Sequence, residues 1–336
     1  MVGAGLAGLS AATRLWAAGL DVQLFEAGSH AGGRLATESI DGFVVDRGFQ
    51  VLNTGYPRAA DLDLDALRLG WFDRGAVVRV DGKAHRVVDP RQRPSGVVGT
   101  ATAPIGSLRD KAALAGFSLR AGYFPVRRLI EAPERTAEQA LRAAGVGDVA
   151  LDRFFRPFLA GVLLEDGLTT SSRYLDLLWR SFVRGSIGLP ANGMQAVGEQ
   201  LAGRLPADRL HLRTPVRVVG PGSVLTDAGR WTADAVVVAT DPDTASRLLP
   251  SVEATATRQV TTHFHVLPGS PWSTPLIVLG QPEGRRLGNR TDVEDADVVG
   301  DRQHRGDPER ESVLDGDRGG GDGVGPPHGV GARPDP

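Results

Sequence analysis

Three glycines near the N-terminus have the spacing of a loop that binds a dinucleotide phosphate. Gly3, Gly5 and Gly8 form a GxGxxG pattern immediately before a helical run, although such a pattern also arises by chance in a glycine-rich chain. The first glycine allows a tight turn, the second lets the backbone approach a pyrophosphate, and the third lets the helix pack closely on a strand. The helix N-terminus attracts phosphate through its free N–H groups and partial positive charge. The predicted site also includes Leu6 and Ala7.

An acidic residue after the next predicted strand narrows the choice of nucleotide. Residues 22–25 are apolar and predict a short, buried parallel strand, and Glu26 closes this strand 18 positions after Gly8. The Glu26 carboxylate could accept hydrogen bonds from ribose hydroxyls, and its charge would repel a 2′-phosphate. The pattern therefore disfavours NADP. Ala27, the next residue, is included in the predicted site.

Together with Gly32, Gly33 and Arg34, the N-terminal segment resembles the FAD enzyme superfamily that contains amine oxidases, phytoene desaturases and protoporphyrinogen oxidases. In that superfamily the Gly-Gly-Arg triplet distinguishes FAD proteins from ordinary NAD dehydrogenases. The resemblance covers about residues 1–280. It implies an FAD cofactor, with Arg34 near the flavin diphosphate and the two glycines where the chain passes close to the cofactor.

Further residues extend the resemblance along the chain. Gly48, Phe49 and Gln50 stand where the family has a segment that faces the flavin ring, although an ordinary turn after a strand is the alternative. Val216 matches the position whose backbone contacts the adenine end, and Ala239 lies in an apolar run that matches the strand beside it. The resemblance therefore implies cofactor contacts from several separate parts of the chain.

Residues 153–161 and 189–194 resemble segments of the substrate domain in the desaturase-like branch. The family usually has two adjacent glycines before the methionine that stands here at position 194, and Asn192 replaces the first of them. The geometry of this loop is therefore left open.

The resemblance implies that the flavin takes hydride from a C–H bond and is then reoxidised, while the protein orients the substrate in a dry pocket. Amine-oxidising members place a lysine near the flavin. Lys83 and Lys111, the only lysines, do not match that position and are expected to be solvated, so the catalytic residues are left unknown. His263 and His265 alternate on a predicted strand, but no third ligand accompanies them and no metal is predicted.

The elements that must position these residues predict an α/β fold. We expect a Rossmann-like FAD-binding domain, with a parallel sheet and helices, and a mixed α+β substrate domain. The FAD-binding domain is predicted at residues 1–73 and 211–250, the substrate domain at 74–210, a further substrate-domain strand segment at 251–280, and a disordered or out-of-frame tail at 281–336.

Local patterns predict particular elements within these segments. Residues 74–88 predict a hairpin that turns at Asp81 and Gly82. Residues 136–144 predict a helix that begins with a capping box. Residues 235–239 predict a strand in the core of the sheet, and residues 261–267 predict another strand.

Composition limits the classes of partner. The chain has 336 residues and no cysteine, which excludes disulfides, iron–sulfur clusters and Cys-type zinc sites. The net charge is −2, with −5 on residues 281–336 and +3 on residues 1–280, and it argues against a nucleic-acid partner. The tail is too poor in large apolar side chains to offset its ordering entropy.

Location is predicted from the absence of two signals. No apolar run reaches about 18 residues and no signal peptide precedes the fold, so a cytoplasmic protein is expected. Residues 108–130 mix apolar and arginine side chains. They could lie on a membrane surface and admit a lipid-like substrate, or form a helix that packs on the core. The substrate, the electron acceptor and the oligomeric state are left open.

Two departures from the family pattern lead us to expect an inactive copy that binds FAD weakly or not at all. Only Met1 and Val2 precede Gly3, and they span about 7 Å where a strand usually needs about 17–20 Å, as if the start codon had been assigned too far downstream. The glycine loop would then lack its central strand. The family's C-terminal flavin segment has no counterpart in residues 281–336. The alternatives are an NAD-linked dehydrogenase and a non-catalytic nucleotide-binding remnant.

Overall fold

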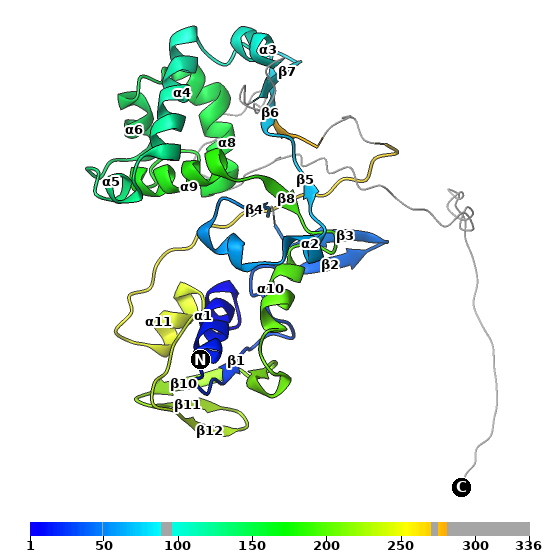
Figure 1. Cartoon of the computed structure of the whole chain (residues 1–336), viewed down its shortest axis with the longest axis vertical. Helices are drawn as coiled ribbons and strands as arrows, with labels where there is room; N and C mark the ends of the chain where they lie inside the picture. The colour runs from blue at the N-terminus through cyan, green and yellow to red at the C-terminus, as the bar shows by residue number, and fades with distance from the viewer. Residues whose placement is uncertain (49, 89–95, 270–274, 281–336) are drawn as a thin grey trace, which may run out of the picture. The chain divides into compact units, whose positions relative to one another are not determined.

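The computed structural model describes residues 1–48, 50–88, 96–269 and 275–280. These residues lie within one compact unit, Met1–Asp301. Phe49 and the tail predicted at residues 281–336 lie outside the described residues. The described chain combines helices with parallel and antiparallel strands, as Figure 1 shows, so the predicted α/β class is confirmed.

A small parallel sheet forms around the first residues of the chain. Val2 bridges Phe25 on one side and Val238 on the other, both in parallel. Four backbone hydrogen bonds of 2.8–3.0 Å hold residues 1–3 between these neighbours. Residues 1–3 form isolated bridges rather than a strand, but these hydrogen bonds still anchor the start of the glycine loop on both sides.

The helix after the glycine loop packs on this sheet. Helix α1 (Leu6–Ala17) buries Leu9 and Ala12 completely, against β1 (Leu24–Phe25) and helix α10 (Gln195–Ala202). Strand β1 pairs in parallel with β9 (Leu210–His211). The sheet and its two covering helices are the part of the fold that positions the glycine loop.

The C-terminal end of this region differs from the sequence prediction. Residues 235–239 were expected as a buried strand, but only Val238 pairs, and Val237 is 40% exposed. Its neighbour, the segment of residues 1–3, offers it a single bridging residue, Val2. Residues 261–267 were also expected as a strand, but they form no strand and are largely exposed. Alternating apolar residues do not form a strand without a partner edge.

The other strands form small sheets with local pairing. The predicted hairpin is confirmed: β6 (Gly75–Val80) and β7 (Lys83–Val88) pair in antiparallel, and positive φ at Asp81 and Gly82 closes the turn. The remaining sheets are β6 with β13 (Ile277–Leu279); β2 (Thr37–Ile40) with β3 (Phe43–Asp46); β8 (Ile187–Leu189) between β4 (Leu52–Asn53) and β5 (Gly70–Trp71); and β11 (Ser223–Thr226) between β10 (Val216–Gly220) and β12 (Gly229–Thr232).

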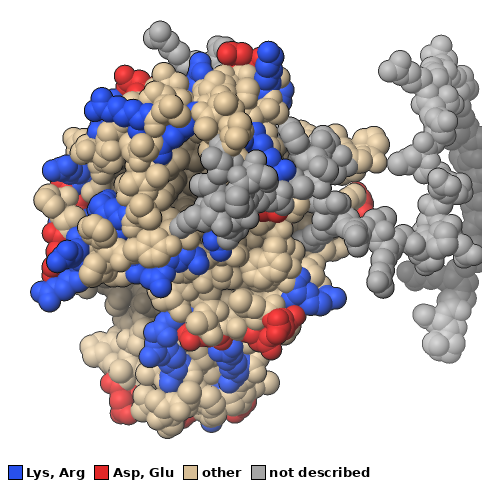
Figure 2. Space-filling view, turned by 45° about the horizontal axis from the view of Figure 1, so that its top comes forward, with Lys and Arg blue, Asp and Glu red and all other residues tan. Residues whose placement is uncertain are grey.

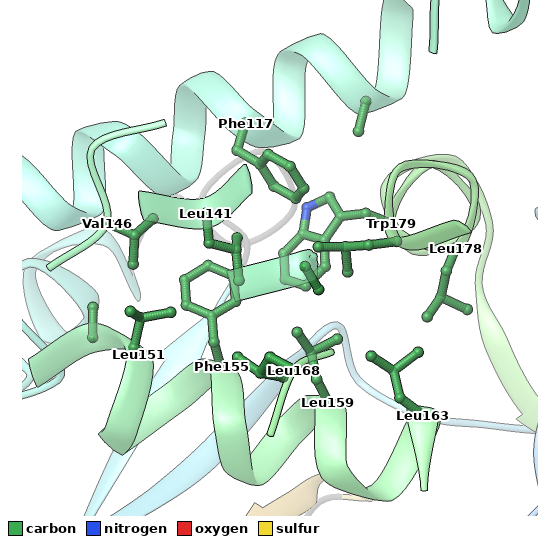
Figure 3. Close-up of a cluster of buried hydrophobic side chains, with 14 of the residues drawn as sticks. Phe117, Leu141, Val146, Leu151, Phe155, Leu159, Leu163, Leu168, Leu178 and Trp179 are labelled. Atoms are coloured by element: carbon green, nitrogen blue, oxygen red, sulfur yellow. The ribbon is translucent and has the colours of Figure 1, made fainter. Parts of the chain in front are cut away.

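A helical region supplies the largest apolar core. In Figure 3, Phe117, Phe155 and Trp179 meet at its centre, and the Trp179 ring lies 5.6 Å from each of the other two. The Trp179 indole N–H donates to the Ser118 hydroxyl at 2.9 Å, so its polar atom is satisfied. The elements here are α4 (Leu108–Tyr123), α5 (Val126–Ile130), α6 (Ala137–Ala143), α7 (Asp148–Ala150), the π-helix η3 (Leu151–Phe155), α8 (Arg156–Leu163) and α9 (Ser172–Arg184).

Side chains begin several of these helices. The capping box predicted for α6 is confirmed, with Thr136 and Gln139 each bonding the other's backbone N–H at 3.1 Å. Ser107 and Asp110 form the same arrangement at α4. The remaining helices are η1 (Pro57–Asp61), α2 (Leu64–Leu67), α3 (Val97–Thr102), η4 (Ala207–Arg209) and α11 (Pro242–Leu248). Within the described ranges, no helix has the length and apolar character needed to cross a membrane.

Candidate nucleotide-binding site

Two of the three loop glycines are required by the packing of the chain itself. Gly3 has φ +95°, and a Cβ atom there would lie 2.9 Å from the Ala239 carbonyl oxygen. A Cβ atom on Gly8 would lie 1.9 Å from the Gly3 carbonyl oxygen. Neither position can accept a side chain without movement of the backbone, so these glycines shape the loop whether or not a ligand is bound.

Gly5 is different, because nothing in the protein requires a glycine there. Its φ is −72°, which any residue can adopt, and a Cβ atom would meet no atom within 4 Å. Gly5 is also the N-cap of α1, and no side chain caps this helix end. The first N–H groups of α1 have no partner within the helix, and Leu6 and Ala7 beside them are exposed. The open space and the uncapped N–H groups together fit a phosphate group.

Glu26 joins the end of β1 to the glycine loop. One carboxylate oxygen accepts a hydrogen bond from the Ala4 N–H, and the other accepts one from the Gly28 N–H, each at 2.8 Å. The side chain is partly exposed and Ala27 beside it is exposed. A carboxylate has about four acceptor positions, so Glu26 can hold the loop and still accept ribose hydroxyls.

The Gly-Gly-Arg triplet lies directly against the glycine loop. Gly32 pairs with Gly5, and the Gly32 N–H donates to the Ala4 carbonyl at 2.8 Å. Gly33 has φ +61°, and a Cβ atom there would lie 3.0 Å from the Gly5 Cα atom. Arg34 is exposed beside them. The structure therefore brings the triplet and the loop together, while the position of Arg34 near a flavin diphosphate, which the resemblance implied, stays a prediction.

Gln50 connects the triplet to the segment that the resemblance placed at the flavin ring. Its side-chain amide donates to the Arg34 carbonyl at 2.7 Å and to the Arg47 carbonyl at 2.8 Å. Gly48, between Arg47 and Gln50, has φ +78°. Phe49 lies outside the described residues. The Gln50 side chain therefore bonds to the protein backbone, and it links the segment at Arg34 to the segment at Arg47.

Ala239 and Val216 lie close to the same loop. The Ala239 N–H donates to the Val2 carbonyl oxygen at 2.8 Å, and a Cβ atom on Gly8 would lie 3.5 Å from the Ala239 Cβ atom. Val216 begins β10, two residues after Thr214, whose N–H donates to the Glu26 carbonyl at 2.8 Å. Ala239 thus lies against the glycine loop, and Val216 packs with Val2 and Phe25.

The loop that the sequence left open, residues 189–194, has one position that requires glycine. Gly193 has φ +83°, and a Cβ atom there would lie 2.2 Å from the Thr37 methyl carbon. Asn192 does not have a positive φ, and its side-chain oxygen accepts a hydrogen bond from Arg68 at 3.4 Å. The substitution of the first family glycine is therefore compatible with this loop.

Replacing Gly193 with alanine is expected to lower the free energy of unfolding by about 1–3 kcal/mol, from the strained backbone and the clash with Thr37. Asn192→Gly is the matched control, and it should cost about 1 kcal/mol or less, because it loses only the long, exposed hydrogen bond from Arg68 and adds entropy to the unfolded chain. Urea unfolding of both variants measures the difference. Equal effects would show that the loop does not have this conformation.

Neither lysine lies at the nucleotide loop. Lys83 is exposed beside the hairpin turn, as expected. Lys111 is half-buried, and its ammonium group donates to the carbonyls of Ala101 and Ala103, the latter at 2.9 Å. The expectation that Lys111 is solvated is wrong, because its long stem reaches the unsatisfied carbonyls at the end of α3.

The predicted histidine pair forms no metal site. His263 and His265 are both exposed, in a segment without a strand. Across the part of the chain that the structure describes, no group of three His, Asp or Glu residues could hold a metal ion.

Comparison with known proteins agrees with this geometry. A family model described as flavin containing amine oxidoreductase matches residues 6–278. The coproporphyrinogen III oxidase of Mycobacterium tuberculosis (strain ATCC 25618 / H37Rv) is 29% identical over 280 residues, which cover 75% of this chain and 60% of that protein. The chain thus spans about 60% of the length of the curated relatives it matches.

Solved structures share the fold. A putrescine oxidase triple mutant with redesigned cofactor binding superposes with a TM-score of 0.52 at 26% identity, over 74% of this chain and 58% of that one. An oxidoreductase from Methanosarcina mazei has a TM-score of 0.54 at 21% identity, over 75% of this chain and 61% of that one, and it supports the fold alone.

Proposed function

The chain belongs to the family of flavin-containing amine oxidoreductases, and from this premise we propose that it is an FAD-dependent oxidoreductase acting on a small or lipid-like molecule. The reaction class is removal of hydride from a C–H bond of that substrate. Two of the similar proteins are a coproporphyrinogen III oxidase and a putrescine oxidase, and they support porphyrinogens and amines as substrate classes.

The observation that carries the proposal is the unused space at Gly5. The chain has a glycine where its own packing needs none, directly beneath uncapped N–H groups of α1. A side chain there would obstruct only something from outside the protein. The diphosphate of FAD fits this position, since the site offers backbone donors, a helix dipole and the exposed Arg34, two residues after Gly32, which bridges Gly5.

The protein's own part in the reaction is binding and orientation. Bound FAD would supply the hydride acceptor. The N–H groups of Leu6 and Ala7 would hold its diphosphate, Glu26 would hold its ribose, and the backbone near Gly48 would lie at the ring. No described side chain is assigned as an acid or base.

The proposal is tested by adding FAD and, separately, ADP to the purified chain and following protein and flavin fluorescence. We expect saturable binding of both ligands, with each displacing the other. The hydrogen bonds that anchor residues 1–3 remove one reason for expecting no binding, and weak affinity for FAD remains a prediction. Binding of NAD but not of FAD would instead favour the NAD-linked dehydrogenase, and binding of none of the three would contradict the proposal.

Contact with an anionic membrane surface is a second part of the proposal. At the end of α4, through α5, five large apolar side chains are 43–64% exposed: Leu119, Tyr123, Phe124, Val126 and Ile130. The arginines Arg127 and Arg128 stand among them and are exposed. Arg127 pairs with Glu131 at 2.7 Å, and residues 119–130 themselves contain no acidic residue. Figure 2 shows blue basic side chains on the left of the molecule, with uncharged surface and some red acidic side chains between them. Apolar and cationic side chains on one face suit the interface of an anionic bilayer.

Flotation with liposomes tests this surface. The chain should float with vesicles of phosphatidylglycerol and phosphatidylcholine, and the double variant Phe124→Ser, Ile130→Ser should lose most of that binding, because each buried CH₂ contributes about 0.8 kcal/mol. Val149→Ser with Val218→Ser is the control, since both valines are about half exposed elsewhere. Equal flotation of the two double variants would refute the membrane surface. A cytoplasmic location, which fractionation of cells would test, completes the proposal.

A further inference from the structure

Asp46 is the buried end of a polar network that joins segments far apart in the sequence. It is the last residue of β3 and is 9% exposed. One of its carboxylate oxygens accepts a hydrogen bond from the Thr37 hydroxyl at 2.6 Å and another from the Met194 N–H at 2.8 Å. Met194 lies 148 residues further along the chain.

The same network continues to the next residue of helix α10. The Thr37 hydroxyl oxygen accepts a hydrogen bond from the Gln195 N–H at 3.0 Å, and the Gln195 side chain accepts one from the Thr37 N–H at 3.3 Å. Helix α10 has no cap from its own N-cap residue, Met194. The side chains of Asp46 and Thr37 therefore satisfy the first N–H groups of α10, and the carboxylate places its charge at the positive end of the helix.

Helix α10 in turn contacts the nucleotide loop. A Cβ atom on Gly198, in the first turns of α10, would lie 2.5 Å from the Gly32 Cα atom. A Cβ atom on Gly193 would lie 2.8 Å from the Asp46 carboxylate. The start of α10 therefore packs closely on Asp46, and the same helix packs closely on the Gly-Gly-Arg triplet at Gly198.

We propose that Asp46 and Thr37 are positioning residues for the flavin site, which cap α10 from outside and so hold the Gly32–Gly33 turn against the glycine loop without touching the cofactor. The inference rests on the proposed function for its last step only. Its first step, capping of α10, concerns the chain by itself and can be measured without flavin.

The capping step is tested by amide hydrogen exchange of the flavin-free chain, followed by NMR. In Asp46→Ala the Met194 and Gln195 amides should exchange roughly tenfold faster, within the range known for loss of a helix cap. Asp46→Asn keeps an acceptor oxygen and should restore much of the protection. Thr37→Val should speed exchange of the Gln195 amide but leave the Met194 amide protected. Thr37→Ser should restore the protection of the Gln195 amide.

A matched control separates local capping from general loss of stability. Thr136→Ala removes the cap of α6 and should leave Met194 and Gln195 unchanged. If Asp46→Ala folds poorly, Asp46→Asn and Thr37→Val carry the test. Unchanged exchange at both amides, or an equal increase throughout the chain, would overturn the inference.

The positioning step is tested by titrating the same variants with FAD. Asp46→Ala and Thr37→Val should bind FAD at least about fivefold more weakly than the wild-type chain, and Thr37→Ser should bind it normally. Wild-type affinity in Asp46→Ala would overturn the positioning role and leave the proposed function intact. If the wild-type chain binds no FAD, the proposed function fails and the positioning role fails with it, whereas faster exchange at Met194 would still establish the cap.

Discussion

Alanine at position 5 is expected to leave the free chain as stable as the wild type and to weaken its binding of FAD. The added methyl group meets no protein atom within 4 Å, and the backbone already has an ordinary φ of −72°. With a diphosphate in place, the same methyl group would occupy its position. Forcing one extra carbon into a packed contact costs about 1–3 kcal/mol, which corresponds to roughly 5- to 150-fold in affinity.

Gly8→Ala is the matched comparison, because the clash there is with the protein. The Cβ atom would lie 1.9 Å from the Gly3 carbonyl oxygen, so the turn must open. We expect Gly8→Ala to lower the melting temperature and Gly5→Ala to leave it unchanged. Thermal unfolding without ligand, followed by an FAD titration of each variant, separates the two effects. A lowered melting temperature in Gly5→Ala would show that this glycine serves the fold rather than a ligand.

Removal of Arg120 is expected to be the most damaging single change in the helical region. Arg120, on α4, donates to the carboxylate of Asp176, on α9, and Asp176 is 2% exposed. Burial raises the pKa of Asp176, and the positive charge and hydrogen bond of Arg120 partly oppose that rise. Arg120→Met would leave a buried carboxylate without its partner, at a cost of about 3–5 kcal/mol of unfolding free energy.

The loss of unfolding free energy in Arg120→Met should depend on pH in a defined direction. A carboxyl group with a raised pKa in the folded state is fully compatible with folding below its unfolded pKa, and it destabilises the fold as the pH rises through the folded value. Without Arg120 the pKa of Asp176 rises further. The variant should therefore be closest to the wild type in acid and furthest from it at neutral pH.

Urea unfolding of the wild type and Arg120→Met at several pH values from acid to neutral measures this dependence. Asp176→Asn is the control, because it removes the buried charge and leaves Arg120, whose side chain is 35% exposed, free to reach water. At neutral pH, Asp176→Asn should lower the free energy of unfolding by less than Arg120→Met does. A deficit in Arg120→Met that does not change with pH would contradict the buried-carboxylate explanation.

Features encoded by neighbouring residues could be predicted from the sequence. The glycine loop, the turn at Asp81 and Gly82, and the capping box at Thr136 each depend on residues within a few positions of one another. Glu26 was predicted as part of the site because it ends the short strand that follows the glycine loop, and the structure shows that it accepts a hydrogen bond from the Ala4 N–H in that loop. The Gly-Gly-Arg triplet was placed at the cofactor by resemblance, and the structure brings it against Gly5.

Features created by contact between distant segments could not be predicted. Nothing near Asp46 in the sequence indicates that its carboxylate accepts the Met194 N–H, and Arg120 lies 56 residues from Asp176. Residues 235–239 have the composition of a core strand, but a strand is buried only where its neighbours extend as far as it does. The anchoring of residues 1–3 could not be predicted either, because it comes from hydrogen bonds to two segments distant in the sequence, near Phe25 and Val238.

The most direct measurement of the central claim is a titration of the wild-type chain and Gly5→Ala with FAD under identical conditions. Saturable binding by the wild type, with affinity at least about fivefold lower in an equally stable Gly5→Ala, is the predicted result. It would show that a ligand occupies the space beside Gly5 and the N-terminus of α1. Equal binding by the two chains, or no binding by the wild type, would contradict the claim that this loop holds the diphosphate of a flavin cofactor.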